Sequence, residues 1–220
     1  PVLFKIGLGA KVQLDVAPGW QRAVGEDAAL SGMADLALGA KWRVVDEAPV
    51  LGAFAVQALL VLPTGSVERG TGTGEAGLNL LAISSRTVRG VALDLNVGYT
   101  RRGGDGTAAP KNSTVWAISS GFPLAGAVGM VAELFGQPGS AGPAGQSPIV
   151  GFLTGLTVEL GLPVVVDAGA IFSVLGFGDT AIYAGVTWNM GRAWGTPPRP
   201  QVDHRWRVHQ VTRDGKGGAP

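Results

Sequence analysis

The side chains of this chain that could carry out chemistry are mainly carboxylates. There is no cysteine, and the two histidines, His204 and His209, lie near the C-terminal end. A Ser-His-Asp hydrolase therefore has no base in the body of the chain, and a zinc site would have only Asp203 beside these histidines. Carboxylate pairs of the kind that glycosidases use stay open as an alternative for four residues: Asp94, Glu133, Glu159 and Asp167.

One glycine motif, Gly72–Gly77, has the G-x-G-x-x-G spacing of a dinucleotide site. Such a site needs a helix directly after the motif, because the N-terminus of that helix binds the pyrophosphate. The segment that follows, residues 78–87, is short and β-like. The motif therefore indicates an external loop, and we expect no cofactor, no bound metal and no enzymatic activity.

The polar candidates occupy regular positions in alternating segments, of which residues 91–100 are the clearest. Apolar side chains occupy positions 91, 93, 95, 97 and 99, and Asp94, Asn96 and Thr100 lie between them. This period of two places the two sets on opposite faces of a β-strand. The same pattern elsewhere predicts one polar face, with these interior residues: Asp15, Asp35, Lys41, Arg43, Gln57, Asn79, Asp94, Asn96, Glu133, Glu159, Asp167 and Asn189.

Alternation and turn signals predict eleven strands. Their connections are alternately short and long, which is typical of an up-and-down antiparallel barrel with tight turns at one rim. Segments of about ten residues fit a tilted membrane crossing better than the shorter strands of soluble sheets. The predicted strands are 2–8, 11–20, 33–45, 52–62, 78–87, 91–100, 113–122, 127–135, 148–160, 164–174 and 180–190.

The composition favours a membrane barrel over a soluble one. Charged residues make up 15% of the 220 residues, against roughly 25% in soluble domains, and no apolar run is long enough for a membrane helix. On this reading the apolar face contacts lipid, whereas a soluble barrel would leave the polar face in solvent. The net charge of +1 gives no reason to expect nucleic acid as a partner.

Several short motifs resemble an outer-membrane family named for the MetA pathway of phenol degradation. Residues 33–43 are similar to its GDL-x-LG-x-K-aromatic-R segment, and residues 60–66 and 72–75 resemble its LPTG and GTG motifs. Residues 95–100 look like its N-x-GY strand, and later segments resemble its closing strands: 132–134, 166–169 and 184–188. Their order along residues 33–190 carries the resemblance.

The resemblance implies a transmembrane β-barrel of the bacterial outer membrane that transports small hydrophobic compounds and has no known catalytic residues. Eleven strands cannot close such a barrel, whose strand number is even, so we expect about twelve, with a first strand upstream of Pro1. Residues 1–191 are the predicted barrel, and 192–220 a Pro-rich, basic, disordered tail.

From these observations we expect passive transport of small, hydrophobic or aromatic molecules, with outer-membrane lipid as the surrounding partner. A non-conducting structural or adhesive barrel, whose external loops bind a partner, is the alternative. An embedded hydrolase is disfavoured because the body of the chain has no histidine.

Overall fold

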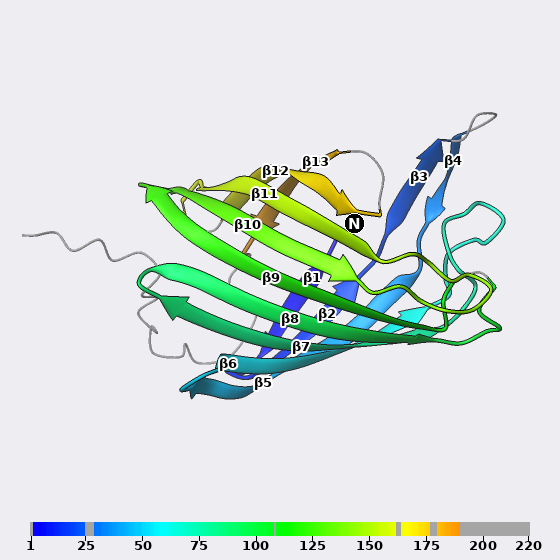
Figure 1. The fold of residues 1–220 in the computed structure, drawn as a ribbon, viewed down its shortest axis with the longest axis horizontal. Coiled ribbons are helices and arrows are strands. Elements are labelled where there is room, and N and C mark those ends of the chain that lie inside the picture. The colour runs from blue at the N-terminus through cyan, green and yellow to red at the C-terminus, as the bar shows by residue number, and fades with distance from the viewer. Residues whose placement is uncertain (1, 25–28, 108, 162–163, 177–179, 190–220) are drawn as a thin grey trace, which may run out of the picture.

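The computed structural model describes residues 2–24, 29–107, 109–161, 164–176 and 180–189. No helix in these ranges is long and apolar enough to cross a membrane. The described residues form thirteen β-strands (Figure 1), which are β1 (Phe4–Leu8), β2 (Val12–Ala17), β3 (Trp20–Val24), β4 (Ala29–Met33), β5 (Leu36–Ala48), β6 (Gly52–Leu62), β7 (Gly77–Val88), β8 (Val91–Arg102), β9 (Asn112–Ala125), β10 (Val128–Gln137), β11 (Ile149–Glu159), β12 (Val164–Leu175) and β13 (Ala181–Trp188).

Eleven of these strands form one antiparallel sheet in the order β1-β2-β5-β6-β7-β8-β9-β10-β11-β12-β13. Each strand pairs with the strands that precede and follow it in the sheet, so the topology is up-and-down, as the sequence predicts. The prediction of an all-β fold with an eleven-stranded, up-and-down antiparallel sheet is confirmed, and β3 and β4 are two further strands that the sequence did not predict. The outer edges of the sheet are β1 and β13, which run in the same direction because an even number of antiparallel steps separates them.

From β1 to β12 the connections alternate in length as predicted, and the long ones gather at one end of the sheet (Figure 1); the last connection, between Leu175 and Ala181, is short. At the opposite end the strands are joined by tight turns. Between β7 and β8 the turn consists of Arg89 and Gly90, whose φ angles are 51° and 84°. Two successive positive φ angles match the right-handed twist of a two-residue hairpin, and glycine adopts one of them without steric cost.

The first long connection contains a hairpin that the sequence did not predict. The strands predicted at residues 11–20 and 33–45 leave residues 21–32 as a connection, and this expectation is wrong for residues 21–24 and 29–32, which lie in the paired strands β3 and β4. The register of this two-stranded sheet joins Trp20 to Met33. Backbone groups alone make these pairs, so a strand can form where the side chains show no clear apolar face.

The sheet buries very little apolar surface. In the part of the chain that the structure describes, the buried hydrophobic side chains are Ala34 and Ala55, whereas Ile182 is 87% exposed and Val186 is 71% exposed. The largest fully buried side chain is a carboxylate, that of Asp15. This distribution is the reverse of a soluble domain, in which burial of apolar side chains is the main stabilising contribution.

The predicted boundary between the barrel and the tail, at residue 191, lies just beyond the last described residue, Asn189. Strand β13 ends at Trp188, close to the predicted barrel boundary at residue 191. The predicted tail, residues 192–220, lies outside the described residues, and so do His204 and His209.

Candidate functional site

The strand register places most of the predicted interior residues on one face of the eleven-stranded sheet. We call this the inner face; it is the face that carries Asp15, Lys41 and Gln57, and the opposite face is the outer face. Lys41 pairs directly with Gln57, and Asp94 is linked through Ser119 to Glu133. The residues of the predicted set that share the inner face are Asp15, Lys41, Arg43, Gln57, Asn79, Asp94, Asn96, Glu133, Glu159 and Asp167.

The outer face is apolar along the same strands. Its aromatic side chains alternate with the inner-face residues, as the sequence predicts, and most of its large hydrophobic side chains are more than one-third exposed. Outward-facing aromatic residues occur on eight strands of this sheet: Phe4, Trp42, Phe54, Tyr99, Trp116, Phe122, Phe152, Phe172 and Trp188.

Asp15 is the most buried polar side chain of the inner face, with 1% of its surface exposed. Gln13 Nε2 donates a hydrogen bond to Asp15 Oδ1 at 2.6 Å, and Gln57 Nε2 donates to Asp15 Oδ2 at 2.5 Å. Gln57 lies on β6 and Asp15 on β2, so this contact spans β5. Asp15 lies opposite Gly39 of β5, so no side chain separates Asp15 from β6. Together with the curl of the sheet in Figure 1, this contact across β5 indicates that the inner face is the concave one.

A second group of polar side chains lies on the later strands. Asp94 on β8 and Glu133 on β10 both lie opposite Ser119 of β9. On β12 and β13, Asp167 lies opposite Gly185, two residues from Tyr183. The Tyr183 ring lies over two glycines: a Cβ at Gly155 would be 2.5 Å from its hydroxyl oxygen, and a Cβ at Gly169 would be 2.8 Å from its Cε1. These glycines therefore provide the space in which Tyr183 reaches across β12 and β11.

A cavity of about 470 Å³ opens on the inner face between β7 and β11. Its apolar wall includes Leu81, Val115, Phe135 and Ile149, and its polar groups belong to three residues: Asn96, Glu133 and Gln137. An apolar wall with a few polar groups is typical of a small-molecule site. Asn96 and Glu133 belong to the predicted interior set. Phe135 does not, although alternation from Glu133 places Phe135 on the same face.

Two residues of the predicted interior set lie outside the strands. Asn189 follows the end of β13 at Trp188, and Asp35 precedes β5. The Asp35 carboxylate accepts hydrogen bonds from the backbone N–H of Gly65 (2.9 Å) and from the backbone N–H (3.0 Å) and hydroxyl (3.2 Å) of Thr73. Asp35 therefore fastens the 63–76 connection to the long-connection end of the sheet.

The two glycine motifs of this connection meet at Asp35. Thr64 Oγ1 accepts a hydrogen bond from the backbone N–H of Leu36 at 2.9 Å, next to the contact between Gly65 and Asp35. A Cβ at Gly65 would lie 2.7 Å from the Cα of Gly72, and a Cβ at Gly72 would lie 2.5 Å from Asp35 Oδ1. Glycine is needed at both positions because the backbones approach too closely for any side chain.

This arrangement also decides between the two interpretations of Gly72–Gly77. Gly77 is the first residue of β7, a strand of 12 residues, so no helix N-terminus is present to bind a pyrophosphate. The residues that the structure describes also contain no group of three or more histidine, cysteine or acidic side chains that could hold a metal ion. The expectation of no enzymatic activity stays a prediction.

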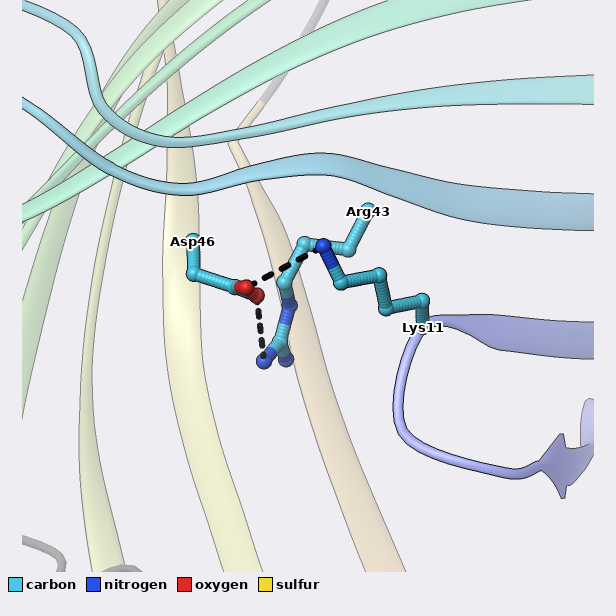
Figure 2. A network of polar contacts seen from close by, with 3 residues as sticks. All are labelled: Lys11, Arg43 and Asp46. Carbon is cyan, nitrogen blue, oxygen red and sulfur yellow. Dashed lines mark ion pairs between the residues drawn. The ribbon is translucent and has the colours of Figure 1, made fainter.

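The ion pairs recorded for the described residues lie at the short-turn end. Asp46 is 3.2 Å from Lys11 Nζ and 3.9 Å from Arg43 Nη1 (Figure 2). All three side chains are about half exposed, so solvent screening leaves this cluster a small share of the stability. Within the described residues, the inner-face carboxylates form no ion pair within 4.0 Å with Lys5, Lys41 or Arg43.

The 103–111 connection lies beside a smaller pocket of about 280 Å³ at the long-connection end. Tyr99 on the outer face donates a hydrogen bond from its hydroxyl to Asn112 Oδ1 at 2.6 Å, and both residues line this pocket. In the connection itself, the hydroxyl and the backbone N–H of Thr107 donate to Asp105 and hold the pKa of that carboxyl below its ordinary value.

Comparison with known proteins supports the resemblance seen in the motifs. A family model described as "Putative MetA-pathway of phenol degradation" matches residues 7–174. The match includes the Asp35 contacts, the 63–76 connection and all strands from β2 to β11. The match confirms the family that the motifs indicate. It begins at residue 7, before the first motif at residues 33–43. No curated protein matches the chain.

Substitution of Asp35 by alanine tests its role in fastening the connection. We expect trypsin to cleave the Asp35→Ala protein after the exposed Arg69 about tenfold faster, because a hydrogen bond to a charged group contributes roughly 1.5–3 kcal/mol and cleavage depends on local opening. Mass spectrometry of timed digests measures this rate. The control is Asp46→Ala, which removes the exposed ion pairs and should leave it unchanged; equal rates in both variants would contradict the role of Asp35.

Proposed function

The chain belongs to the MetA-pathway phenol-degradation family, and we propose that it is a bacterial outer-membrane β-barrel that passes small, hydrophobic or aromatic molecules. The observation that carries this proposal is the reversed burial of the sheet. Asp15 is buried on the concave inner face, while large apolar side chains such as Ile182 are exposed on the outer face. An exposed apolar surface of this extent is a liability in water and the lipid-contacting surface of a transmembrane barrel.

Closure of the barrel is part of the proposal. A sheet edge in lipid would leave backbone N–H and C=O groups unsatisfied, so only a closed sheet can span the membrane. β1 and β13 run in the same direction, and one further strand antiparallel to both would complete an even-numbered, fully antiparallel barrel. We propose twelve strands on this basis, with short turns at the periplasmic rim and long connections outside.

The proposed mechanism is passive passage along the inner face. A barrel of about twelve strands is narrow, and side chains fill much of its interior. The 470 Å³ cavity on the inner face gives a solute room along this path. Phe135 and Leu81 provide apolar contact for an aromatic body, and Glu133 or Asn96 accepts a hydrogen bond from its polar group. The fastened 63–76 connection lies at the outer entrance.

A non-conducting barrel whose external connections bind a partner is the second candidate. The pocket between the 103–111 and 138–148 connections favours it, because Lys111, Asn112 and Ser140 present polar groups there. The two candidates differ in whether a solute passes through the interior of the barrel. Measuring the flux of a solute into vesicles that contain the protein decides between them.

The first measurement is heat-modifiability. We expect the detergent-extracted protein to migrate faster on a gel when it is not boiled, because a membrane barrel keeps its compact fold in detergent. Circular dichroism of the unboiled sample should show β-structure. A protein that is folded and soluble without detergent would contradict the membrane proposal.

A pair of lysine substitutions on adjacent residues of β8 tests which face contacts lipid. Leu95 is 45% exposed on the outer face, and Asn96 lines the inner cavity. We expect Leu95→Lys to lower the free energy of unfolding in lipid vesicles by roughly 2–4 kcal/mol, the cost of a cation near the bilayer midplane. Asn96→Lys should cost clearly less. If the outer face instead contacts water, Leu95→Lys would be neutral or stabilising, and urea titration distinguishes these results.

Filling the cavity tests the path. Ala117 lines it, whereas the next residue, Ile118, points to the outer face and is 53% exposed. We expect Ala117→Trp to reduce the protein-dependent flux of a small aromatic solute into vesicles severalfold, and Ile118→Trp to leave it unchanged. Both variants must show the heat-dependent mobility shift. Equal flux in the two variants would exclude this cavity from the path.

A further inference from the structure

The charges of the inner face are segregated between the first and the later strands. The inner-face cations of β1 and β5 are Lys5, Lys41 and Arg43. The inner-face carboxylates of β8, β10, β11 and β12 are Asp94, Glu133, Glu159 and Asp167. We call these groups the basic wall and the acidic wall.

Both walls also contain charges of the opposite sign, and these are engaged locally. On β5 of the basic wall, Asp46 forms ion pairs with Arg43 and with Lys11. Asp15 lies in the basic wall, where the side-chain amides of Gln13 and Gln57 bind both of its carboxylate oxygens. Arg102 shares the face of the acidic wall but lies at the end of β8. Its guanidinium donates from Nη1 to the carbonyl oxygen of Pro110 (3.0 Å) and to Ser113 Oγ (3.3 Å).

The two walls do not neutralise each other by direct contact. The ion pairs of the described residues converge on Asp46 at the short-turn rim, where Arg43 takes part in one of them. Lys5 and Lys41 form no ion pair within 4.0 Å in this part of the chain. Asp94 and Glu133 both lie opposite Ser119 of β9, so two carboxylates of the acidic wall lie at the same level of the inner face.

The curvature of the sheet sets the walls opposite each other. In Figure 1, β1 and β2 pass behind β8 and β9, because the sheet curls until its first strands face its middle strands. Since the inner face is concave, the side chains of both walls point toward the same interior. Charges of opposite sign on facing walls produce an electric field across that interior, and its low-dielectric surroundings strengthen the field.

We propose that this charge segregation selects dipolar solutes: small aromatic molecules with a cationic group at one end and an anionic group at the other. Such a solute turns its cationic group toward the acidic wall and its anionic group toward the basic wall. A solute with a single charge is attracted by one wall only. The inference rests on the proposed function and deepens it, because it names the charge pattern of the solute.

Three solutes with one aromatic body in common provide the test. They are phenylalanine, which is zwitterionic, phenethylammonium, which is a cation, and 3-phenylpropionate, which is an anion. We measure their flux into vesicles that contain the full chain and subtract the flux into protein-free vesicles. We expect phenylalanine to cross roughly fivefold faster than either singly charged solute, the factor expected from one weak charge pair.

Neutralising one wall should remove the faster flux of phenylalanine. Which singly charged solute is slowed with it identifies the wall that was neutralised. Asp94→Asn with Glu133→Gln should slow phenylalanine and phenethylammonium relative to 3-phenylpropionate. Lys5→Gln with Lys41→Gln should slow phenylalanine and 3-phenylpropionate relative to phenethylammonium. The matched control is Glu68→Gln with Arg69→Gln, which removes two exposed charges of the 63–76 connection and should change none of the ratios.

The outcomes separate this inference from the proposed function. Flux of all three solutes without an advantage for phenylalanine in the wild-type protein would overturn the charge selection and leave the pore intact. No protein-dependent flux of any solute would overturn both. The wild-type comparison decides the inference even if a wall variant fails to fold, which loss of the heat-dependent mobility shift would reveal.

Discussion

Backbone pairing between neighbouring strands fixes which side chains this sheet turns inward, and the rest of the structure depends on that register. Because side chains alternate along a strand, a slip of one residue would move Asp94 and Glu133 to the outer face and Leu95 and Leu134 to the inner one. The pairs Leu95↔Ile118 and Asp94↔Ser119 show the register that keeps the two sets apart. Apolar burial within the protein contributes little to this register, since the buried hydrophobic side chains of the described residues are two alanines.

Two groups of side-chain hydrogen bonds join parts of the fold that backbone pairing does not join directly. On the inner face, Gln13 and Gln57 enclose the carboxylate of Asp15 and join β2 to β6 across β5. At the long-connection end, Asp35 holds the 63–76 connection through Gly65 and Thr73. Both contacts use a carboxylate as the acceptor, and hydrogen bonds to charged groups are stronger than neutral ones. The short motifs of the family thus have a physical explanation in this contact.

The proposed transport and the proposed charge selection use different features of the same inner face. Passage depends on space, which the cavity beside Phe135 provides. Selection depends on the placement of charge, with Lys5 and Lys41 on one side and Asp94 and Glu133 on the other. Tyr183 belongs to the acidic side, where the missing side chains of Gly155 and Gly169 allow its ring to lie across two strands. A change in one feature need not alter the other, which makes the two proposals separable.

The sequence by itself determined the eleven strands, the alternation of short and long connections, the two faces and the family, because each follows from local periodicity, turn residues or short motifs. Only the tertiary structure decided the partners of the polar side chains. The sequence placed Asp35 with the interior residues, but Asp35 binds residues 65 and 73, and the separation along the chain gives no sign of this contact. Residues 29–32, which were predicted to lie in a connection, belong to β4, because backbone pairing with β3 needs no side-chain pattern. The contact of Asp15 with Gln57 and the facing of the two walls likewise arise from the curvature of the sheet, which periodicity along a single strand does not encode.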